Sequence, residues 1–340
     1  EGTPFFKKGF PPPALPRRRT MTQFTSEDDL LSCIDRHFAR AGRGILLPRG
    51  DDAAVVDFPG QVCVTTDLFL EDVHFRRTYF SPTDVGHKAL AVNLSDVAAM
   101  GCRPTGFVLG LICPEDADRD YWDGVLAGMA ELATRFEVPL AGGDLSRGDK
   151  VGLSLTVWGE PWETRRFLTR GTARTGDMLF VVGEIGLARV GLAVLEKRGP
   201  EAAADFPNAV AAHLRPEPEV AAGRILAGTC GVTACMDVSD GLARDLPRLL
   251  PPGCGADLFL PPTALHPEVT AHALGHGRTP EKEAVFGGED YALLATIAPA
   301  DWPTVKNALP QARAIGVVTA KPGFTLNGAP FDAHGFDHFG

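Results

Sequence analysis

The chain has 340 residues, of which 44% are hydrophobic and 22% charged, so a large packed core is possible and disorder of the bulk is excluded. Asp and Glu number 43 against 33 Lys and Arg, and the net charge of −10 argues against a nucleic-acid partner, because a polyanion is repelled. Nucleotides stay open, since their phosphates can be held through metal ions. No run approaches about 18 apolar residues, so no membrane span is predicted.

The cysteines predict a protein with reduced thiols. There are seven of them, an odd number, and no Cys-x-x-Cys pair occurs. Cys63 lies between two valines and Cys113 follows Leu-Ile, which favours buried thiols over metal ligands. Because disulfides are rare in the cytosol, this pattern predicts a cytoplasmic location.

Residues 1–20 are expected to form a disordered basic, proline-rich extension. Pro11, Pro12 and Pro13 exclude a helix, and the apolar run of a signal peptide is missing. The rest of the chain is long enough for two domains, which we place at 21–160 and 161–340.

The first domain is predicted to mix helices and strands. Ser26 has the spacing of a helix cap, and Ser81-Pro82 opens a long helix, with serine as the cap and proline in the first turn. Pro59-Gly60 is typical of a hairpin between two short strands. The predicted elements are a helix from 27 to about 40 with Leu30, Leu31, Ile34 and Phe38 on one face, strands at 53–58 and 61–66, a helix at 82–100, a strand at 105–113, a helix at 118–136, and strands at 138–141 and 151–159 around a glycine-rich loop.

The second domain follows a polar connector at 165–176. Short apolar runs predict its strands, and Pro251-Pro252-Gly253 ends one of its helices. The predicted elements are strands at 178–182, 232–238, 291–297 and 312–318 and helices at 187–197, 218–227, 242–250 and 302–309. The whole chain is therefore expected to be an α/β protein of the α+β type.

Six acidic clusters share one local pattern, in which Gly, Ser, Thr or Asn stands beside Asp at the end of a strand or within a helix. Mg²⁺ prefers hard oxygen ligands, and carboxylates aimed at one point repel each other unless cations neutralise them. A neighbouring glycine lets the backbone approach a phosphate closely. The clusters are Gly50-Asp51-Asp52, Thr65-Thr66-Asp67, Asn93-Leu94-Ser95-Asp96, Gly142-Gly143-Asp144, Asp237-Val238-Ser239-Asp240-Gly241 and Gly287-Gly288-Glu289-Asp290.

Each cluster also has an ordinary structural interpretation. A single Gly-Asp-Asp or Ser-Asp-Gly is most often a turn or a helix cap. Asp96 differs, because it lies within an apolar helical stretch, where a carboxylate is rare without a partner or a metal. Periodicity alone leaves a structural and a functional role for Asp96 equally open. The chain has no P-loop, protein-kinase signature, His-Glu-x-x-His or Gly-x-Ser-x-Gly motif.

Taken in order, the clusters resemble thiamine-monophosphate kinase, of the aminoimidazole-ribonucleotide-synthetase-like superfamily. The similarity runs from Glu27 to Phe339, and the ordered set is more specific than any single motif. It rests on GDDAAVV (50–56), TTDLFLEDVHF (65–75), GHKALAVNLSDVAAMGCRP (86–104), GGDLSRG (142–148), LTRGTARTGD (168–177), MDVSDGLARDL (236–246), GGEDYALL (287–294) and GFDHF (335–339).

The resemblance implies a two-domain synthetase-like fold, with N-terminal strands forming a barrel across a homodimer, and ATP- and Mg²⁺-dependent phosphorylation of thiamine phosphate to thiamine diphosphate. The implied catalytic residues are Asp67, Asp96, Asp237 and Arg170. The implied ligands of several Mg²⁺ ions are Asp52, Thr65, Thr66, Asp67, Asp96, Asp144, Asp237 and Asp240. Gly143, Asp144, Arg170, Ser239 and Trp122 would contact ATP, and His74, Glu289 and Phe336 would hold thiamine phosphate.

Three positions depart from the family pattern. Asp72 replaces a small residue before Val-His-Phe, Leu145 replaces Thr after Gly-Gly-Asp, and Ala292 replaces Glu after Tyr291. None of these removes an implied ligand, but Asp72 leaves the pose of His74 open.

Parts of the sequence are also compatible with other functions. Within the superfamily, a ribonucleotide cyclase, a selenophosphate synthetase or a hydrogenase-maturation dehydratase would also use ATP. The last typically has a C-terminal Cys, whereas this sequence ends in Gly340, and Cys33 lies in a predicted helix instead of the reactive loop of a selenophosphate synthetase. An inactive nucleotide-binding homologue and a metal-dependent phosphatase are the remaining alternatives.

Overall fold

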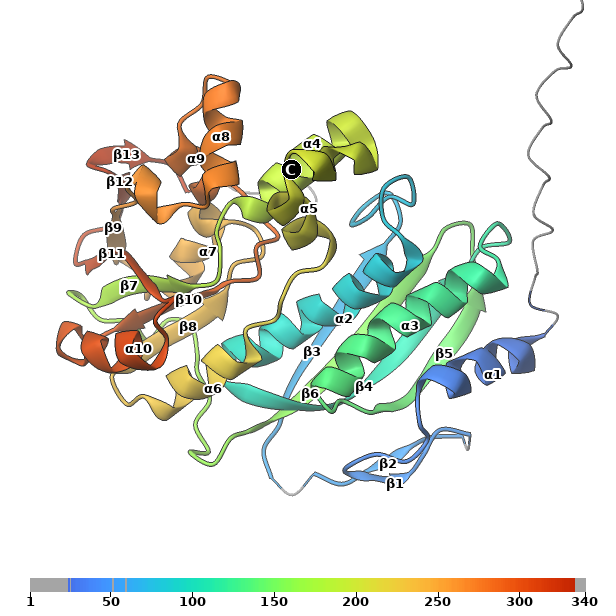
Figure 1. Ribbon diagram of the computed structural model, residues 1–340. Coiled ribbons are helices and arrows are strands. Elements are labelled where there is room, and N and C mark those ends of the chain that lie inside the picture. The colour runs from blue at the N-terminus through green and yellow to red at the C-terminus, as the bar shows by residue number, and fades with distance from the viewer. Residues whose placement is uncertain (1–23, 25, 51, 59, 334–340) are drawn as a thin grey trace, which may run out of the picture.

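The computed structural model describes residues 24–333 except 25, 51 and 59, so the predictions for residues 1–20 and for Phe336 lie outside it. The chain forms two units that lie side by side (Figure 1). The elements of the first unit are α1 (Glu27–His37), β1 (Ile45–Leu47), β2 (Val55–Val56), β3 (Cys63–Leu70), α2 (Pro82–Ala99), β4 (Cys102–Cys113), α3 (Arg119–Arg135), β5 (Leu140–Arg147) and β6 (Gly152–Pro161).

Helices α2 and α3 cover one face of a four-stranded sheet (Figure 1), whose strand order is β3-β6-β4-β5. Strands β4 and β5 run parallel, and the other pairs are antiparallel. Phe107 and Leu155 point toward the helices and are buried, whereas Val64, Leu68 and Ile112 are 63%, 58% and 40% exposed. The second face of the sheet therefore presents apolar side chains to solvent.

The two helices begin where the sequence predicts. Ser81 accepts a hydrogen bond from the backbone N–H of Asp84, whose carboxylate accepts one from the N–H of Ser81, and Pro82 occupies the first turn of α2. Asp118 caps α3 by accepting from the N–H of Tyr121 at 2.9 Å.

Glycines bring α2 and α3 into backbone contact. A Cβ placed on Gly86 would lie 1.8 Å from the carbonyl oxygen of Val125, and one on Gly128 would lie 2.0 Å from that of Thr83. Neither obstacle is a side chain that can turn aside. The close approach seats α2 firmly between α3 and the second unit.

The second unit is built on a seven-stranded sheet of order β13-β12-β9-β11-β7-β10-β8. All five residues of β10 are buried, and its two neighbours run antiparallel to it. The elements, with η for 3-10 helices, are β7 (Met178–Val182), α4 (Leu187–Arg198), η1 (Gly199–Ala204), α5 (Pro207–Leu214), α6 (Val220–Gly228), β8 (Val232–Asp237), α7 (Leu242–Leu249), β9 (Gly255–Leu258), η2 (Pro262–Ala264), α8 (Pro267–Gly275), α9 (Pro280–Val285), β10 (Leu293–Ile297), η3 (Pro299–Asp301), α10 (Trp302–Ala308), β11 (Arg313–Thr319), β12 (Phe324–Leu326) and β13 (Ala329–Phe331).

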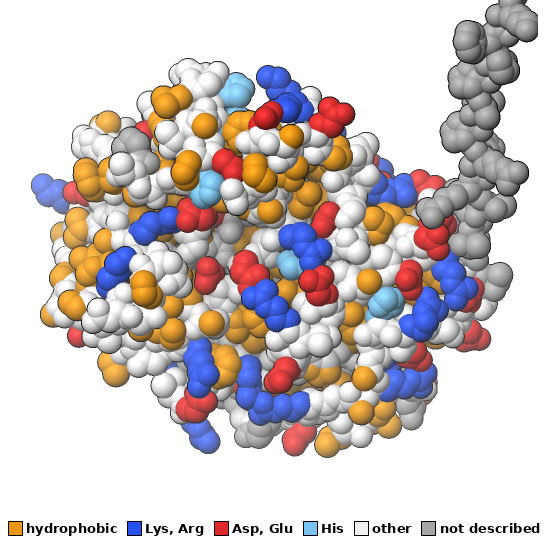
Figure 2. Space-filling view, in the orientation of Figure 1, with side chains coloured by type: hydrophobic (Ala, Val, Ile, Leu, Met, Phe, Trp, Pro, Cys, Tyr) orange, Lys and Arg blue, Asp and Glu red, His pale blue; other side chains and the backbone are white. Residues whose placement is uncertain are grey.

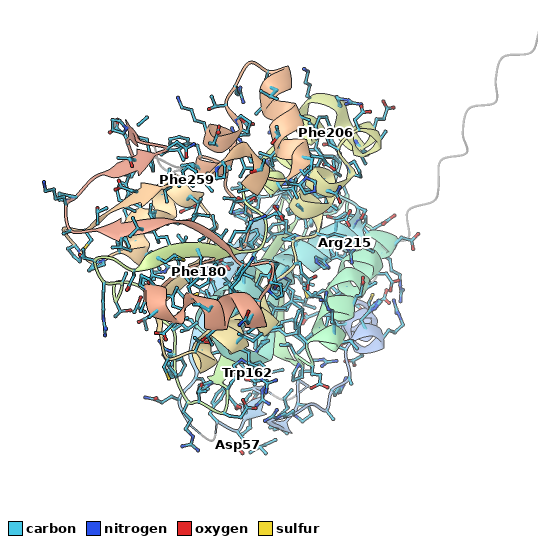
Figure 3. All side chains as sticks on the ribbon, turned by 60° about the vertical axis from the view of Figure 1, so that its left-hand side comes forward. Asp57, Trp162, Phe180, Phe206, Arg215 and Phe259 are labelled. Carbon is cyan, nitrogen blue, oxygen red and sulfur yellow. The ribbon has the colours of Figure 1, made fainter. Side chains whose placement is uncertain are left out.

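Helix α2 is also the contact surface between the two units. Helix α6 packs on its C-terminal end, where a Cβ on Gly223 would lie 2.2 Å from the carbonyl oxygen of Ala98. Near its N-terminal end, the guanidinium of Arg215 lies 3.5 Å from the carboxylate of Asp84 and 2.8 Å from that of Glu131 on α3. Figure 3 labels Arg215 at this junction.

The α+β class is confirmed, but two local predictions are wrong. Residues 53–58 and 61–66 do not form a hairpin, because β2 pairs with β1 and β3 pairs with β6. The glycine-rich segment between 138–141 and 151–159 is no loop, because Gly143 and Asp144 lie within β5 and pair with Leu109 and Gly110. Long-range strand pairing overrides the local turn signals in both places.

Smaller differences concern burial and short elements. Leu31 is 40% exposed, and the buried face of α1 carries Leu30, Cys33 and Ile34. Sequence analysis missed α5, α8 and α9 and the strands β1, β9, β12 and β13, which are mostly too short to show a clear period.

The thiols and the surface agree with the composition. All seven cysteines are unpaired, but only three of them are buried. Cys63 and Cys113, expected to be buried, are half-buried like Cys254, and Cys230 is exposed. Within residues 24–333 as described, no helix combines the length and apolarity needed to cross a bilayer. Figure 2 shows acidic and basic side chains interspersed over one face, so the excess negative charge is not collected there.

The close contact of α2 and α3 predicts that Gly86→Ala destabilises the fold by about 1–3 kcal/mol, because the new methyl group must push two helix backbones apart. Urea unfolding measures the change. The matched control is Gly228→Ala at the end of α6, where no atom lies within 4 Å of the new Cβ. Equal stability of the two variants would contradict the packing argument.

Candidate active site

A cavity of about 650 Å³ lies between α2, β3 and the loops that follow β8 and α9. It contains seven of the residues singled out from the sequence, although they come from four separate stretches of the chain. These residues are Asp67, His74, Asp96, Asp237, Ser239, Asp240 and Glu289.

Strand β3 and helix α2 supply one wall. Side chains alternate along β3, so Thr65 and Asp67 share the face that turns toward α2. The hydroxyl of Thr65 donates to a carboxylate oxygen of Asp96 at 2.5 Å. Asp96 is thereby fixed on the helix face that lines the cavity.

The end of β8 supplies the opposite wall. Asp237 is the last residue of this strand and is 3% exposed, and one of its oxygens accepts from the hydroxyl of Ser95 at 2.9 Å. Asp240 follows in the turn, where Arg248 contacts its carboxylate at 2.7 Å and Arg244 at 3.6 Å. Asp240 thus already has cationic partners, whereas Asp237 is held by a neutral hydroxyl.

The carboxylates of Asp67, Asp96 and Asp237, here called the inner carboxylates, repel one another. Burial and then the charge of Asp96 raise the pKa of Asp67 to about 6 and that of Asp237 to about 7. Burial also raises the pKa of Asp96, although the hydrogen bond from Thr65 and the charge of Arg170 act in the opposite direction. Arg170 is exposed, and its positive charge acts to lower the pKa of Asp237.

This donor set fits Mg²⁺, which prefers hard oxygen ligands and is commonly held by one or two carboxylates together with substrate phosphates. The inner carboxylates have excess negative charge that a divalent cation would neutralise. Their oxygens do not meet at one point. In the described part of the chain, Cys33, His37 and Asp123 alone bring three ligand atoms within 4.8 Å of one another. There the guanidinium of Arg36 already contacts Asp123 at 2.7 Å.

The far end of the cavity combines apolar side chains with charged ones, among them the carboxylates of Glu196 and Glu289. Phe69, Phe75 and Tyr79 line it together with Leu192 of α4. The side chain of Glu289 also points into this end. The backbone of Glu289 has a φ of 65°, a conformation that non-glycine residues seldom adopt. Two buried side chains, Lys88 and His213, contact the Glu289 carboxylate at 3.2 Å each.

His74 is held independently of Asp72. Its Nδ1 accepts from the backbone N–H of Leu70 at 3.0 Å, and its ring stacks on Phe69. Asp72, with φ of 64°, turns its carboxylate toward Lys150 at 2.8 Å. The acidic residue at this position therefore leaves the ring of His74 in place.

Several predicted residues do not line this cavity. Asp52 and Asp144 are exposed elsewhere, and Gly143 lies beside Asp144 in β5. Thr66 faces away from Asp67, since its hydroxyl donates to the carbonyl oxygen of Leu155. A shared metal site for the side chains of Thr66 and Asp67 is therefore not supported within one chain. Phe336 lies outside the described residues.

Trp122 does not reach the carboxylate cavity either. Its side chain has no exposed surface, and its indole N–H has no hydrogen-bond partner. It adjoins a second cavity of about 240 Å³, lined also by Leu30, Cys113 and Leu145. Trp122 is thus a core residue that shapes this cavity, and its expected contact with ATP stays a prediction.

Sequence reasoning missed the residues that the second unit adds to the cavity. Arg189, Leu192 and His213 come from α4 and α5, and no motif connects them with β3. Lys88 had a recognisable signal, because it is a charged residue within the same apolar helical stretch that made Asp96 stand out.

Comparisons with known proteins point to one family. Residues 50–160 match the AIR synthase related protein N-terminal domain, and residues 174–328 match the C-terminal domain of that family. The thiamine-monophosphate kinase of Rhodopirellula baltica is 37% identical over 261 residues, which cover 74% of this chain and 75% of the relative. That of Bacillus subtilis is 36% identical over 273 residues, covering 76% and 79%. The structure described as AaThiL complexed with AMPPCP and TMP superposes with a TM-score of 0.75 at 31% identity, covering 92% of this chain and 97% of that one.

The raised pKa values predict how stability depends on pH without metal. Because the pKa values of Asp67 and Asp237 exceed 3.8 in the folded state, the folded protein holds protons that the unfolded chain has released. The melting temperature in EDTA should therefore fall as pH rises from about 4 to about 7. Excess Mg²⁺ should reduce this fall, and so should Asp237→Asn. An identical pH profile with EDTA and with Mg²⁺ would show that these carboxylates bind no cation in the free protein.

Proposed function

The chain belongs to the thiamine-monophosphate kinase family, and we propose from this that it transfers the γ-phosphoryl group of ATP to thiamine phosphate, giving thiamine diphosphate and ADP. The observation that carries the proposal is the cavity, which has acidic residues at one end and aromatic and aliphatic side chains beside Glu196 and Glu289 at the other. A phosphorylated substrate with an aromatic head needs both ends.

The reaction requires positioning more than proton transfer. The bond between the γ-phosphorus and the oxygen it shares with the β-phosphate breaks, and its electron pair leaves with ADP. A new bond forms to a phosphate oxygen of thiamine phosphate, which is already largely deprotonated at neutral pH. The task of the chain is therefore to bring two polyanions into line and to balance their charge.

We assign roles to the cavity residues on this basis. Asp67, Asp96 and Asp237 would hold Mg²⁺, with Thr65 fixing the orientation of Asp96 and Asp240 at the rim. Bound Mg²⁺ supplies positive charge that offsets the charge of the phosphates. Arg170 adds a further positive charge on the nucleotide side, where Ser239 would contact the phosphates.

The nucleotide base is assigned to the second cavity. Leu145, which lines this cavity, immediately follows Gly143 and Asp144 in β5, so phosphates near Asp144 would place the base beside Leu30. In the larger cavity, at the end away from the inner carboxylates, His74 and Glu289 would hold thiamine phosphate together with Phe336.

A second copy of the chain would complete the site. Asp67 lies on β3 and Asp144 on β5, at opposite edges of a sheet in which β6 and β4 stand between them. Three strand spacings separate these edges by roughly 14 Å. The open apolar face with Val64, Leu68 and Ile112 offers a surface that a homodimer would bury. We therefore propose that each site takes Asp67 from one protomer and Asp52 and Asp144 from its partner.

We propose a cytoplasmic location from the state of the cysteines. All seven are unpaired, which suits a reducing compartment.

Purified protein incubated with ATP, Mg²⁺ and thiamine phosphate should yield thiamine diphosphate and ADP in equal amounts, and EDTA should abolish both.

Asp67→Asn and Asp237→Asn should each lower kcat by about 100-fold or more, since charge balance at the phosphates is lost. Both variants should melt no earlier than the wild type, because a repelling charge is removed. The matched control is Asp120→Asn at an exposed site on α3. Near-normal turnover in both cavity variants would exclude the proposed metal site, and ADP without thiamine diphosphate would redirect the substrate.

The shared site predicts complementation between two inactive variants. If Asp67 and Asp144 act across the interface, mixing Asp67→Asn with Asp144→Asn should restore about a quarter of wild-type activity, because half the dimers are mixed and each has one intact site. Subunit exchange is verified by mass spectrometry with differently tagged chains. Activity that stays absent despite complete exchange would place both carboxylates in the site of one chain.

A further inference from the structure

We propose that Lys88 and His213 are positioning residues that fix the carboxylate of Glu289 in the cavity, so that its remaining lone pairs receive N–H donors of the substrate's heterocycle. The inference rests on the proposed function, and it adds two residues to which the sequence motifs assigned no role. Lys88 comes from α2 and His213 from α5, so both units of the fold hold this one side chain.

The contacts divide the carboxylate evenly. The Nζ of Lys88 lies 3.2 Å from Oε1 of Glu289, and the Nδ1 of His213 lies 3.2 Å from Oε2. A carboxylate has about four acceptor positions, so each oxygen keeps capacity for a further donor. Glu289 is 28% exposed and lines the cavity, whereas Lys88 and His213 are 0% and 1% exposed. The two donors therefore lie behind the carboxylate, which faces the cavity.

Packing alone does not account for this arrangement. Removing an ammonium group from water carries a large desolvation cost, and an apolar side chain of similar volume fills such a space at lower cost. The Nε2 of His213 is buried without a hydrogen-bond partner, which is a further cost. Both costs are explained if the ionised and correctly aimed Glu289 is what the site needs.

The backbone around Glu289 is restrained in the same way. Its N–H donates to the carbonyl oxygen of Ser239 at 2.7 Å, and the N–H of Tyr291 donates to that of Val238 at 2.8 Å. The carboxylate of Asp290 accepts from the N–H groups of Gly186 and Ala188, at the start of α4. Positive φ angles at Glu289 and Tyr291 persist because these contacts hold the segment, as is common at functional sites.

The charges keep Glu289 ionised. Burial by itself would raise the pKa of its carboxyl, but the charge of Lys88 and the hydrogen bond from His213 hold that pKa well below its ordinary value. Burial lowers the pKa of His213, and the charge of Lys88 lowers it further, so the ring is neutral and can donate from Nδ1. The result is a fixed negative charge beside the apolar side chains of the cavity, suited to an amino group on a cationic aromatic substrate.

Helix α2 sets the distance between this end and the carboxylates of the metal site. Lys88, Val92 and Asp96 recur at intervals of four residues, and Val92 and Asp96 line the cavity. Two helical turns separate Lys88 from Asp96, which is about 12 Å along the axis. One helix therefore positions the residues that recognise the heterocycle and those that recognise the phosphate.

The test compares Lys88→Met, His213→Leu and His213→Asn in the full-length protein. Asn retains an N–H near the position of Nδ1, whereas Leu does not. Lys88→Met and His213→Leu should raise the KM for thiamine phosphate by about 10- to 100-fold, since a hydrogen bond to a charged group is lost. The KM for ATP should change less than about twofold in every variant, and His213→Asn should recover most of the loss. The matched control is Lys321→Met at an exposed site in the connection between β11 and β12.

Calorimetric titration with thiamine phosphate measures binding without turnover and separates the two hypotheses. Wild-type protein that binds thiamine phosphate but makes no thiamine diphosphate contradicts the proposed function, while weaker binding in the variants still supports the positioning role. Folded variants with unchanged KM and unchanged binding overturn that role, as does an equal loss of affinity for both substrates. If Lys88→Met does not fold, the comparison of His213→Leu with His213→Asn decides. Wild-type protein that does not bind thiamine phosphate overturns both.

Discussion

Buried negative charge is the constraint on which the rest of this site depends. Asp67, Asp96 and Asp237 face one cavity, and burial together with the charge of Asp96 raises the pKa of Asp67 to about 6 and that of Asp237 to about 7. Such an arrangement persists only where the surrounding fold holds it, because each carboxylate would gain from separation. Strand β3, helix α2 and the end of β8 supply that restraint, and the hydroxyls of Thr65 and Ser95 fix the oxygens without neutralising them.

Helix α2 connects the carboxylate site to the packing of the rest of the molecule. Its glycine contact with α3 leaves no room for displacement, α6 packs against its C-terminal end, and Arg215 ties its N-terminal end to the second unit. The same helix carries Lys88 behind Glu289 and Asp96 among the acidic residues. Cavity geometry and fold stability are therefore coupled through one element, whose unusual content of buried polar groups reflects its two tasks.

At the other end of the cavity, side chains of the protein itself balance the negative charge. Glu289 is paired with Lys88 and contacted by His213, and these two groups hold the pKa of its carboxyl well below the ordinary value. The inner carboxylates have Arg170 as a counter-charge and retain a deficit of positive charge. A cation with bound phosphates suits the uncompensated end, and a neutral or singly charged N–H donor suits the compensated one.

The sequence by itself determined the local elements and the chemistry of their residues. The caps at Ser26 and Ser81 located two helix starts, and apolar runs located most of the strands, because these signals depend on neighbours a few residues apart. The ordered acidic motifs likewise identified the family. Only the tertiary structure decided that β3 pairs with β6 instead of β2, that Gly143 and Asp144 belong to a strand, and that Trp122 is enclosed in the core. It also decided that Lys88 and His213, 125 residues apart, meet at one carboxylate. These outcomes depend on pairing and packing between segments distant in the chain, for which local periodicity carries no signal.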